Sequence, residues 1–257
     1  MSTVAEIAGA LAEKTRPELA APWDPVGVQL GDPGAPVETL AVCHEVTEEV
    51  VTALGEDKAD LLITYHPLLF SPTNRLVAGR SPEARAFSLI AIGVGLLVIH
   101  TDFDVAPGGA ADALAGLLDL RKITPFGAMD KDGAGQIGRV GMFEASLDTL
   151  DARLSDAFGH HGLRISGDRD RHLEKVAVIP GSGSHLIREA AEIADALVTG
   201  DVSHHRAVMA ADLGLAIADP GHIATERPGL EALVGMVRQV TEARVIDLTH
   251  LDPQTWT

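Results

Sequence analysis

The regular alternation between short apolar runs and amphipathic segments is the feature that most constrains this fold. In the first half of the chain, strand-like runs at Thr39–Val46, "DLLITY" and "GLLVIHTDFD" are separated by helical segments. One of those segments opens with Ser81 followed by a proline, a pair typical of a helix start. Such alternation predicts an α/β fold with a largely parallel sheet.

The rhythm of the chain changes after about Leu120. A glycine-rich connection, Gly127–Gly141, leads into a second series of alternating strand-like and helical segments. A chain of 257 residues is long enough for two modest domains, each with its own core. We therefore predict two α/β domains with the second inserted into the first: residues 1–124 plus 226–257 form the first, and residues 125–225 form the second.

Charge and cysteine content exclude several classes of protein. The formal net charge of -17, from 37 acidic and 20 basic residues, repels nucleic-acid phosphates and anionic membranes, so we expect no partner of either kind. Cys43 is the only cysteine, which excludes an intrachain disulfide and a thiolate zinc cage. No signal-peptide pattern and no apolar run of roughly 20 residues is visible, so we expect a cytoplasmic protein.

Metal-capable side chains follow four of the predicted strands, where open α/β sheets usually place their ligands. The four segments are "TYHP" with Tyr65 and His66, "HTDFD" with His100 and Asp104, "GDVSHH" with His204 and His205, and "GHIATE" with His222 and Glu226. Imidazole and carboxylate ligands together suit zinc, manganese, iron or cobalt, whereas a calcium site rarely recruits histidine. The combination predicts a divalent-metal site, although a single histidine at a strand end is more often structural.

His222 and Glu226 are four residues apart. If the turn between them is helical, both side chains face the same way and can bind one ion. Alternatively, Thr225 caps the following helix and Glu226 favours the positive end of its dipole. Both interpretations can hold together.

His100, Asp102 and Asp104 alternate along one predicted strand, so each could be a ligand or a hydrogen-bond partner of one. The alternative for Asp104 is a turn that caps the glycine loop after it. The sequence does not choose among the three.

The segment "IPGSGSHLIREA" is similar to a loop that binds phosphate at a helix N-terminus. It lacks the Gly-Lys-Ser/Thr ending of a P-loop and the spacing of a dinucleotide-binding motif. A tight strand-to-helix turn is the favoured interpretation.

Six segments taken in order resemble one known family, the GTP cyclohydrolase 1 type 2 homologs, also called the Ngg-interacting-factor-three-like proteins. The segments are "WDPVGVQLGDP", "LLITYHPLLFSP", "HTDFDVAPGGAADALA", "IGRVG", "VTGDVSHH" and "DPGHIATERPGL". Together they span nearly the whole chain. The resemblance implies a two-domain α/β protein, a ring-shaped homohexamer and a dinuclear divalent-metal site facing the interior.

The resemblance also implies roles for four residues. His66 and Asp104 would bind the first metal, His222 would bind the second, and Glu226 would bridge both. Tyr65 departs from the pattern, because many members carry two adjacent histidines there, the first of which binds the second metal. A neutral phenol, with a pKa near 10, is a poor ligand. We therefore expect one firm site and a weak or empty second one, unless Tyr65 ionises or another histidine, His205 or His100, replaces it.

Two smaller departures are Pro25, where an asparagine is common, and Cys43–Thr47, where a pair of an apolar residue and aspartate is common. Both affect the expected details of local loops rather than the fold.

These features favour a metal-dependent hydrolase of the GTP cyclohydrolase type, acting on a nucleotide or a related small molecule. A bound ion lowers the pKa of water toward neutrality, and His205 is the candidate general base or acid. The alternative is a metal-binding regulatory or chaperone-like protein without turnover, which the replacement at Tyr65 favours. A purely structural role for the four candidate ligands predicts instead that they do not converge.

Overall fold

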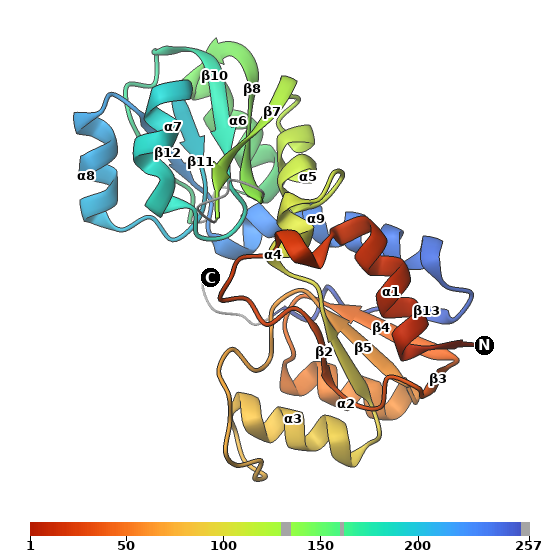
Figure 1. Cartoon of the computed structure of the whole chain (residues 1–257). Coiled ribbons are helices and arrows are strands. Elements are labelled where there is room, and N and C mark those ends of the chain that lie inside the picture. The colour runs from red at the N-terminus through yellow and green to blue at the C-terminus, as the bar shows by residue number, and fades with distance from the viewer. Residues whose placement is uncertain (130–134, 160–161, 253–257) are drawn as a thin grey trace. The chain divides into compact units, whose positions relative to one another are not determined.

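The computed structural model describes residues 1–129, 135–159 and 162–252. The chain forms two compact units, with Met1–Ala106 and the described residues 233–252 in unit 1 and Pro107–Ala232 in unit 2 (Figure 1). Both are built from strands and helices, which confirms the predicted α/β class. These units are defined by contacts, and the domain limits stated above stay predictions of where separately folding parts would end.

Unit 1 has a five-stranded sheet in the order β13-β4-β5-β6-β2. Its strands are β2 (Gly27–Leu30), β4 (Thr39–Cys43), β5 (Leu61–Thr64), β6 (Gly95–Val98) and β13 (Arg244–Asp247). The four strands β13, β4, β5 and β6 are parallel, and only β2 runs against its neighbour. β4, β5 and β6 are almost wholly buried, as expected for a parallel sheet covered on both faces.

The helices of unit 1 are α1 (Val4–Thr15), α2 (Glu48–Asp57), α3 (Pro82–Ala91) and α4 (Thr101–Val105). A two-stranded ribbon of β1 (Ser2–Thr3) and β3 (Pro36–Val37) precedes β4. Figure 1 shows α2 and α3 on one face of the sheet and α1 on the other. Leu54 of α2 and Leu89 of α3 share one core cluster with Leu62 and Leu96 of the sheet. The predicted helix start at Ser81 is confirmed, because its hydroxyl accepts a hydrogen bond from the Ala84 amide at 3.2 Å.

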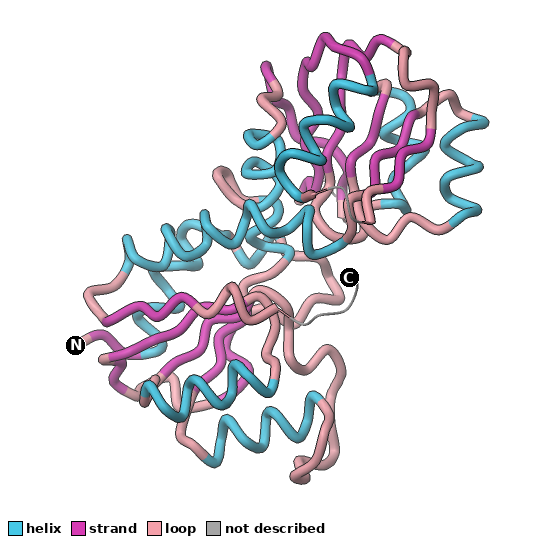
Figure 2. The backbone as a smooth tube through the Cα atoms, turned by 180° about the vertical axis from the view of Figure 1, so that it is seen from behind, coloured by secondary structure: helices cyan, strands magenta, loops and turns pink. Residues whose placement is uncertain are grey.

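Unit 2 has a six-stranded mixed sheet in the order β7-β8-β10-β11-β12-β9. Its strands are β7 (Arg121–Ala128), β8 (Gln136–Ser146), β9 (Arg164–Ser166), β10 (His172–Val178), β11 (Ala196–Val198) and β12 (Ala216–Asp219). The helices are α5 (Ala110–Leu117), α6 (Leu147–Phe158), α7 (Ile187–Ile193) and α8 (His204–Asp212). Two separate core clusters, one beneath α5 and α6 and one beneath α7 and α8, show that helices cover both faces (Figure 2).

α9 (His222–Val240) begins in unit 2 and ends in unit 1. Pro228 lies within this helix, in its second turn. Among the described residues, none of the helices combines the length and apolar character needed to cross a membrane.

The expectation of a glycine-rich connection at Gly127–Gly141 is wrong for most of its described part. β7 and β8 form an antiparallel hairpin there, and residues 130–134 lie outside the described residues. The glycines serve close packing inside the sheet: a Cβ at Gly141 would lie 2.9 Å from the Leu120 Cβ, and one at Gly138 would overlap the Phe126 ring. The largely parallel arrangement holds for unit 1, whereas unit 2 pairs only β10, β11 and β12 in parallel.

An aspartate fixes the strand register in each unit by the same contacts. Asp60 Oδ2 accepts the amides of Glu38 and Thr39 at 2.8 and 2.9 Å, at the start of β4. Asp195 Oδ2 makes the equivalent contacts with two amides of β10, at 2.8 and 3.0 Å. Each aspartate thus aligns neighbouring parallel strands at one end, and side chains at the other end inherit that alignment.

Replacing Asp60 tests this register. We expect Asp60→Ala to lower the free energy of unfolding by about 1–3 kcal/mol, because two backbone amides lose their acceptor. Asp60→Asn is the matched control, since one carbonyl oxygen can still accept from both amides, as Oδ2 does now. Urea unfolding measures both variants, and an Asp60→Ala protein as stable as Asp60→Asn would contradict the assigned role.

Candidate metal centre

The ladder between β4 and β5 continues beyond the last paired strand residues. Cys43 pairs with Thr64, and the Tyr65 amide then donates to the Cys43 carbonyl at 3.1 Å. The His66 amide donates to the His44 carbonyl at 2.9 Å. His44 and His66 therefore leave the carboxyl ends of neighbouring parallel strands side by side, the edge at which such sheets place ligands.

His44 is the residue that sequence reasoning missed. Its segment, Cys43–Thr47, was expected to differ from the family only in loop details. In the structure His44 is buried, with 1% of its surface exposed, and its ring centroid lies 4.5 Å from that of His66. The predicted run Thr39–Val46 hid this position, because β4 ends at Cys43 and His44 directly follows it, the criterion that selected His66.

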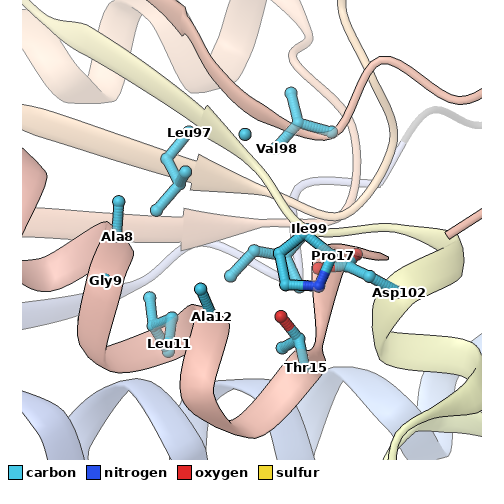
Figure 3. A pocket seen from close by; sticks show the side chains of 11 residues that line it. Ala8, Gly9, Leu11, Ala12, Thr15, Pro17, Leu97, Val98, Ile99 and Asp102 are labelled. Carbon is cyan, nitrogen blue, oxygen red and sulfur yellow. The ribbon is translucent and has the colours of Figure 1, made fainter. Parts of the chain in front are cut away.

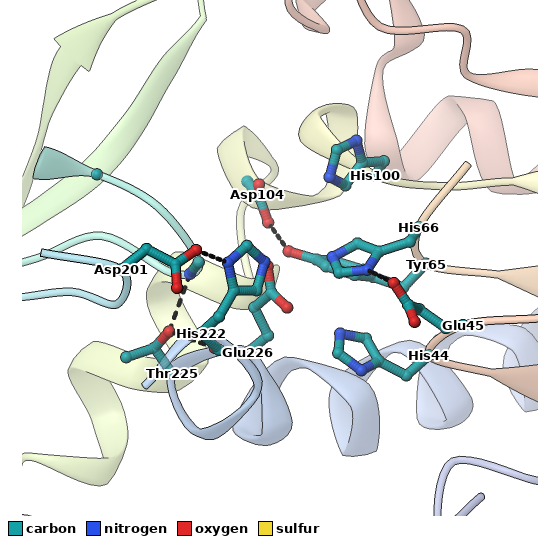
Figure 4. A network of polar contacts seen from close by, with 12 residues as sticks. His44, Glu45, Tyr65, His66, His100, Asp104, Asp201, His222, Thr225 and Glu226 are labelled. Carbon is teal, nitrogen blue, oxygen red and sulfur yellow. Dashed lines mark hydrogen bonds and ion pairs between the residues drawn. The ribbon is translucent and has the colours of Figure 1, made fainter. Parts of the chain in front are cut away.

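Three histidines of unit 1 each place Nδ1 against a carboxylate. The pairs are His44 with Asp252 at 3.1 Å, His66 with Glu45 at 3.1 Å, and His100 with Asp24 at 2.9 Å (Figure 4 shows the His66 pair). A carboxylate beside Nδ1 favours the tautomer whose proton is on Nδ1. The lone pair of the neutral ring is then on Nε2, the atom that can bind a metal.

Asp24 is ionised within this cluster. Burial would raise its pKa, but hydrogen bonds from the His100 ring and from Thr101 outweigh that effect and hold the pKa below its usual value. A carboxylate kept ionised in this way is a strong partner for the His100 Nδ1–H group.

Tyr65 is fully buried, and its hydroxyl donates a hydrogen bond to Asp104 Oδ1 (Figure 4). Asp104 is buried as well, with 4% of its surface exposed. The phenol hydrogen is thus directed at a carboxylate rather than at solvent. This contact orients Asp104, the predicted metal ligand of α4.

The expectation that His100, Asp102 and Asp104 alternate along one strand face is wrong. β6 ends at Val98, and Thr101–Val105 is the helix α4. Asp102 Oδ1 accepts the amide of His100 at 2.8 Å, so that side chain folds back on the start of the helix. Within this short helix the two acids have different partners: Asp102 contacts the His100 amide, and Asp104 contacts Tyr65.

Asp102 borders a pocket between α1 and β6 (Figure 3). The cavity has a volume of about 280 Å³, and apolar side chains such as Leu11, Leu97 and Ile99 line most of it. Burial raises the pKa of Asp102. The pocket thus presents one acid to an otherwise apolar space and offers no imidazole ligand from its lining residues.

In unit 2, α9 begins at His222, so the helical turn considered for His222 and Glu226 is present. His222 Nε2 lies 3.1 Å from Glu226 Oε1, and Glu226 is buried. His222 Nδ1 meets Asp201 Oδ2 at 2.7 Å, which repeats the imidazole–carboxylate pairing of unit 1 (Figure 4). Thr225 does not cap the helix, because its hydroxyl donates to the His222 carbonyl at 2.7 Å within the first turn.

Two loop glycines allow this pair to fit. Gly181 has φ +63°, and a Cβ there would lie 2.5 Å from Glu226 Oε1. A Cβ at Gly200 would lie 2.6 Å from the backbone nitrogen of His222. The Gly181 amide donates to the Thr225 hydroxyl at 2.9 Å, and the Gly183 amide to a threonine hydroxyl at 2.8 Å. These amides are used within the protein, as in the tight turn favoured over a phosphate loop.

His205 lies in the first turn of α8 and is exposed. Its ring centroid is 5.6 Å from that of His204. Its role as a general base stays a prediction, and so does the sharing of one cation by His66, Asp104, His222 and Glu226. Within unit 1 the structure brings His66 to His44 and Asp104 to Tyr65, and within unit 2 it brings His222 to Glu226.

Comparison with known proteins gives a consistent result. The family model described as Duf34/NIF3 (NGG1p interacting factor 3) matches residues 2–253. The chain is 32% identical to the "GTP cyclohydrolase 1 type 2 homolog" of Streptomyces coelicolor, covering 99% of this chain and 94% of that protein. It is similar to the solved structure of reduced HcgD from Methanocaldococcus jannaschii, with 26% identity, a TM-score of 0.84 and coverage of 96% and 98%. Staphylococcus aureus protein SA1388, at 21% identity, TM-score 0.90 and coverage of 100% and 99%, shares the fold.

Substitution of Gly181 tests the packing around Glu226. We expect Gly181→Ala to lower the free energy of unfolding by about 1 kcal/mol through its left-handed backbone, and to displace the Glu226 carboxylate as well. Gly214→Ala is the matched control, because φ is +72° and its Cβ would meet no described atom within 4 Å. Crystal structures and urea unfolding of both variants measure the effect, and an unmoved Glu226 in Gly181→Ala would contradict the packing described.

Proposed function

The chain belongs to the Duf34/NIF3 (NGG1p interacting factor 3) family, and we propose that it is a divalent-metal-binding protein that hydrolyses a nucleotide or a related small molecule. Relatives that carry the name GTP cyclohydrolase 1 type 2 homolog support the substrate class. The metals that suit the donor set are zinc, iron, manganese and cobalt.

The observation that carries this proposal is the repeated pairing of a histidine Nδ1 with a carboxylate. It occurs for His44, His66 and His100 in unit 1 and for His222 in unit 2. Metal-binding histidines characteristically donate their second ring N–H group to a carboxylate, which fixes the tautomer and increases the basicity of the ligand nitrogen. A single pairing of this kind can be purely structural. Its repetition for several histidines, in both units, favours a ligand role.

Buried charge supports the same conclusion. Asp24 Oδ1 is buried and meets no hydrogen-bond partner among the described residues, although its carboxylate is ionised. A buried anionic oxygen without a partner is costly, and a nearby cation or a water bound to it offsets that cost. The residues present therefore fit a divalent ion.

A divalent ion held by these residues would supply the chemistry that activates water for attack on an electrophilic carbon or phosphorus. His66 and Asp104 supply a nitrogen and an oxygen ligand from unit 1, and His222 with Glu226 supplies the same pair of atom types from unit 2. His205 is proposed as the general base or acid, because it is exposed in the first turn of α8 and imidazole is the side chain that most often fills this role. Glu45 and Asp201 orient the two ligand rings.

Binding without turnover, in a regulatory or chaperone-like role, is the second candidate function. Tyr65 favours it, because its hydroxyl is committed to Asp104 in a buried position. A site with fewer protein ligands can hold one ion. A dinuclear mechanism, in contrast, uses two ions.

Turnover and metal content separate the two functions. We expect the purified full chain to contain a transition metal by elemental analysis and to hydrolyse at least one compound in a panel of GTP, other nucleotides and phosphoesters. Glu226→Gln should reduce turnover by about 100-fold or more while keeping the fold, and His172→Ala, on an exposed position of β10, should match the wild type. A metal-loaded wild type inert on the whole panel would leave the binding function, and a metal-free protein would exclude both.

Single substitutions in each unit test whether one ion uses both. We expect His66→Ala and His222→Ala each to weaken binding of the same Zn²⁺ equivalent by about 100-fold, because each removes a nitrogen ligand. Titration of the metal-free protein by calorimetry measures the affinity and the stoichiometry. Loss of one equivalent in His66→Ala with a second equivalent lost only in His222→Ala would show two independent ions instead.

A further inference from the structure

We propose that His44 is a metal ligand of this chain, acting together with His66, and that Tyr65 is a positioning residue that holds Asp104. This assignment rests on the proposed metal-binding function and changes its ligand set. It adds a buried residue that the sequence analysis does not select as a candidate ligand.

The His44 and His66 rings lie close together on a backbone that is already fixed. The ring centroids of His44 and His66 lie 4.5 Å apart, and the candidate ligand nitrogens of the two rings lie within 4.8 Å of each other. Two nitrogens bound at about 2.1 Å to one ion can be at most about 4.2 Å apart. Small rotations of two side chains therefore suffice. The backbone beneath them is fixed by the hydrogen bond from the His66 amide to the His44 carbonyl.

The two imidazole rings are also oriented in the same way. Nδ1 of His44 faces Asp252, and Nδ1 of His66 faces Glu45. The same ring atom is thus engaged in both residues, and the basic nitrogen of each neutral ring is Nε2. Two neutral imidazoles with matching tautomers are a normal pair of ligands for a divalent transition metal.

The charged groups around the two rings also favour a bound cation. Carboxylates outnumber imidazoles in the cluster of unit 1, which combines Asp24, Glu45, Asp104 and Asp252 with His44, His66 and His100. A divalent cation between the rings would balance the charge of these acids.

Tyr65 contributes to the site through a hydrogen bond. Its hydroxyl donates to Asp104 Oδ1, and this bond requires the phenol to keep its proton. A phenol binds a metal well only as the phenolate. Tyr65 therefore acts through Asp104, by fixing one of its carboxylate oxygens.

The experiment titrates the metal-free full chain with Zn²⁺ and, for spectroscopy, with Co²⁺. We expect His44→Ala to raise the Zn²⁺ dissociation constant by about 100-fold or more and to change the visible spectrum of the Co²⁺ form, since a nitrogen ligand is lost. Tyr65→Phe should raise the dissociation constant only about 10-fold and leave that spectrum unchanged, as expected for a residue beyond the ligands. His172→Ala is the control for removal of an exposed histidine.

Two further variants keep the proposal testable if His44→Ala fails to fold. We expect His44→Gln and Asp252→Asn to fold as judged by circular dichroism and to weaken Zn²⁺ binding, Asp252→Asn by about 10-fold, because it acts through His44. His100→Ala is the competing assignment. Wild-type affinity in His44→Gln and Asp252→Asn, or a loss confined to His100→Ala, would overturn the role of His44. A wild type that binds no metal would instead refute the proposed function itself.

Discussion

The backbone hydrogen bonds that extend the β4–β5 ladder past the ends of the strands are the constraint on which the rest of the candidate site depends. They hold Tyr65 against Cys43 and His66 against His44, in a part of the sheet that is buried on both faces. Side chains on such a support lose little further freedom on binding a ligand, because their backbone is already ordered. Asp60, which directly precedes β5, fixes the same register at the opposite end of the strand.

A second shared feature is that each site histidine is oriented by an acid far away in the sequence. Asp252 is 208 residues from His44, and Asp24 is 76 residues from His100. Each contact fixes a ring, and each brings an additional negative charge into a protein that already carries a formal net charge of -17. Acids concentrated around neutral rings would destabilise the folded chain on their own, and a bound cation removes that cost. The proposed metal binding would therefore be linked to the folding stability of this chain.

The sequence predicted what local chemistry determines. The alternation of strands and helices, the helix start at Ser81 and the helical spacing of His222 and Glu226 depend on residues within one or two turns of each other. It did not predict the β7–β8 hairpin, because glycines that look like loop residues fill close contacts with Phe126 of β7 and with Leu120, which directly precedes β7. The helix α4 was missed for a related reason: "HTDFD" continues an apolar strand without a break, and only the bond from the His100 amide to Asp102 marks the turn. His44 was missed because its partner, Asp252, lies at the other end of the chain.

Tyr65 shows how one substitution redistributes roles within a fixed backbone. Tyr65 is buried and points at Asp104, and the strand ladder fixes the backbone from which it extends. An imidazole there could take part in coordination, whereas a protonated phenol can only donate a hydrogen bond to the carboxylate. In the proposed ligand set that part passes to His44, whose ring leaves the same sheet edge from the adjacent strand. The ends of the parallel strands thus provide more positions than one ion needs, and the side chains at those positions decide which of them bind.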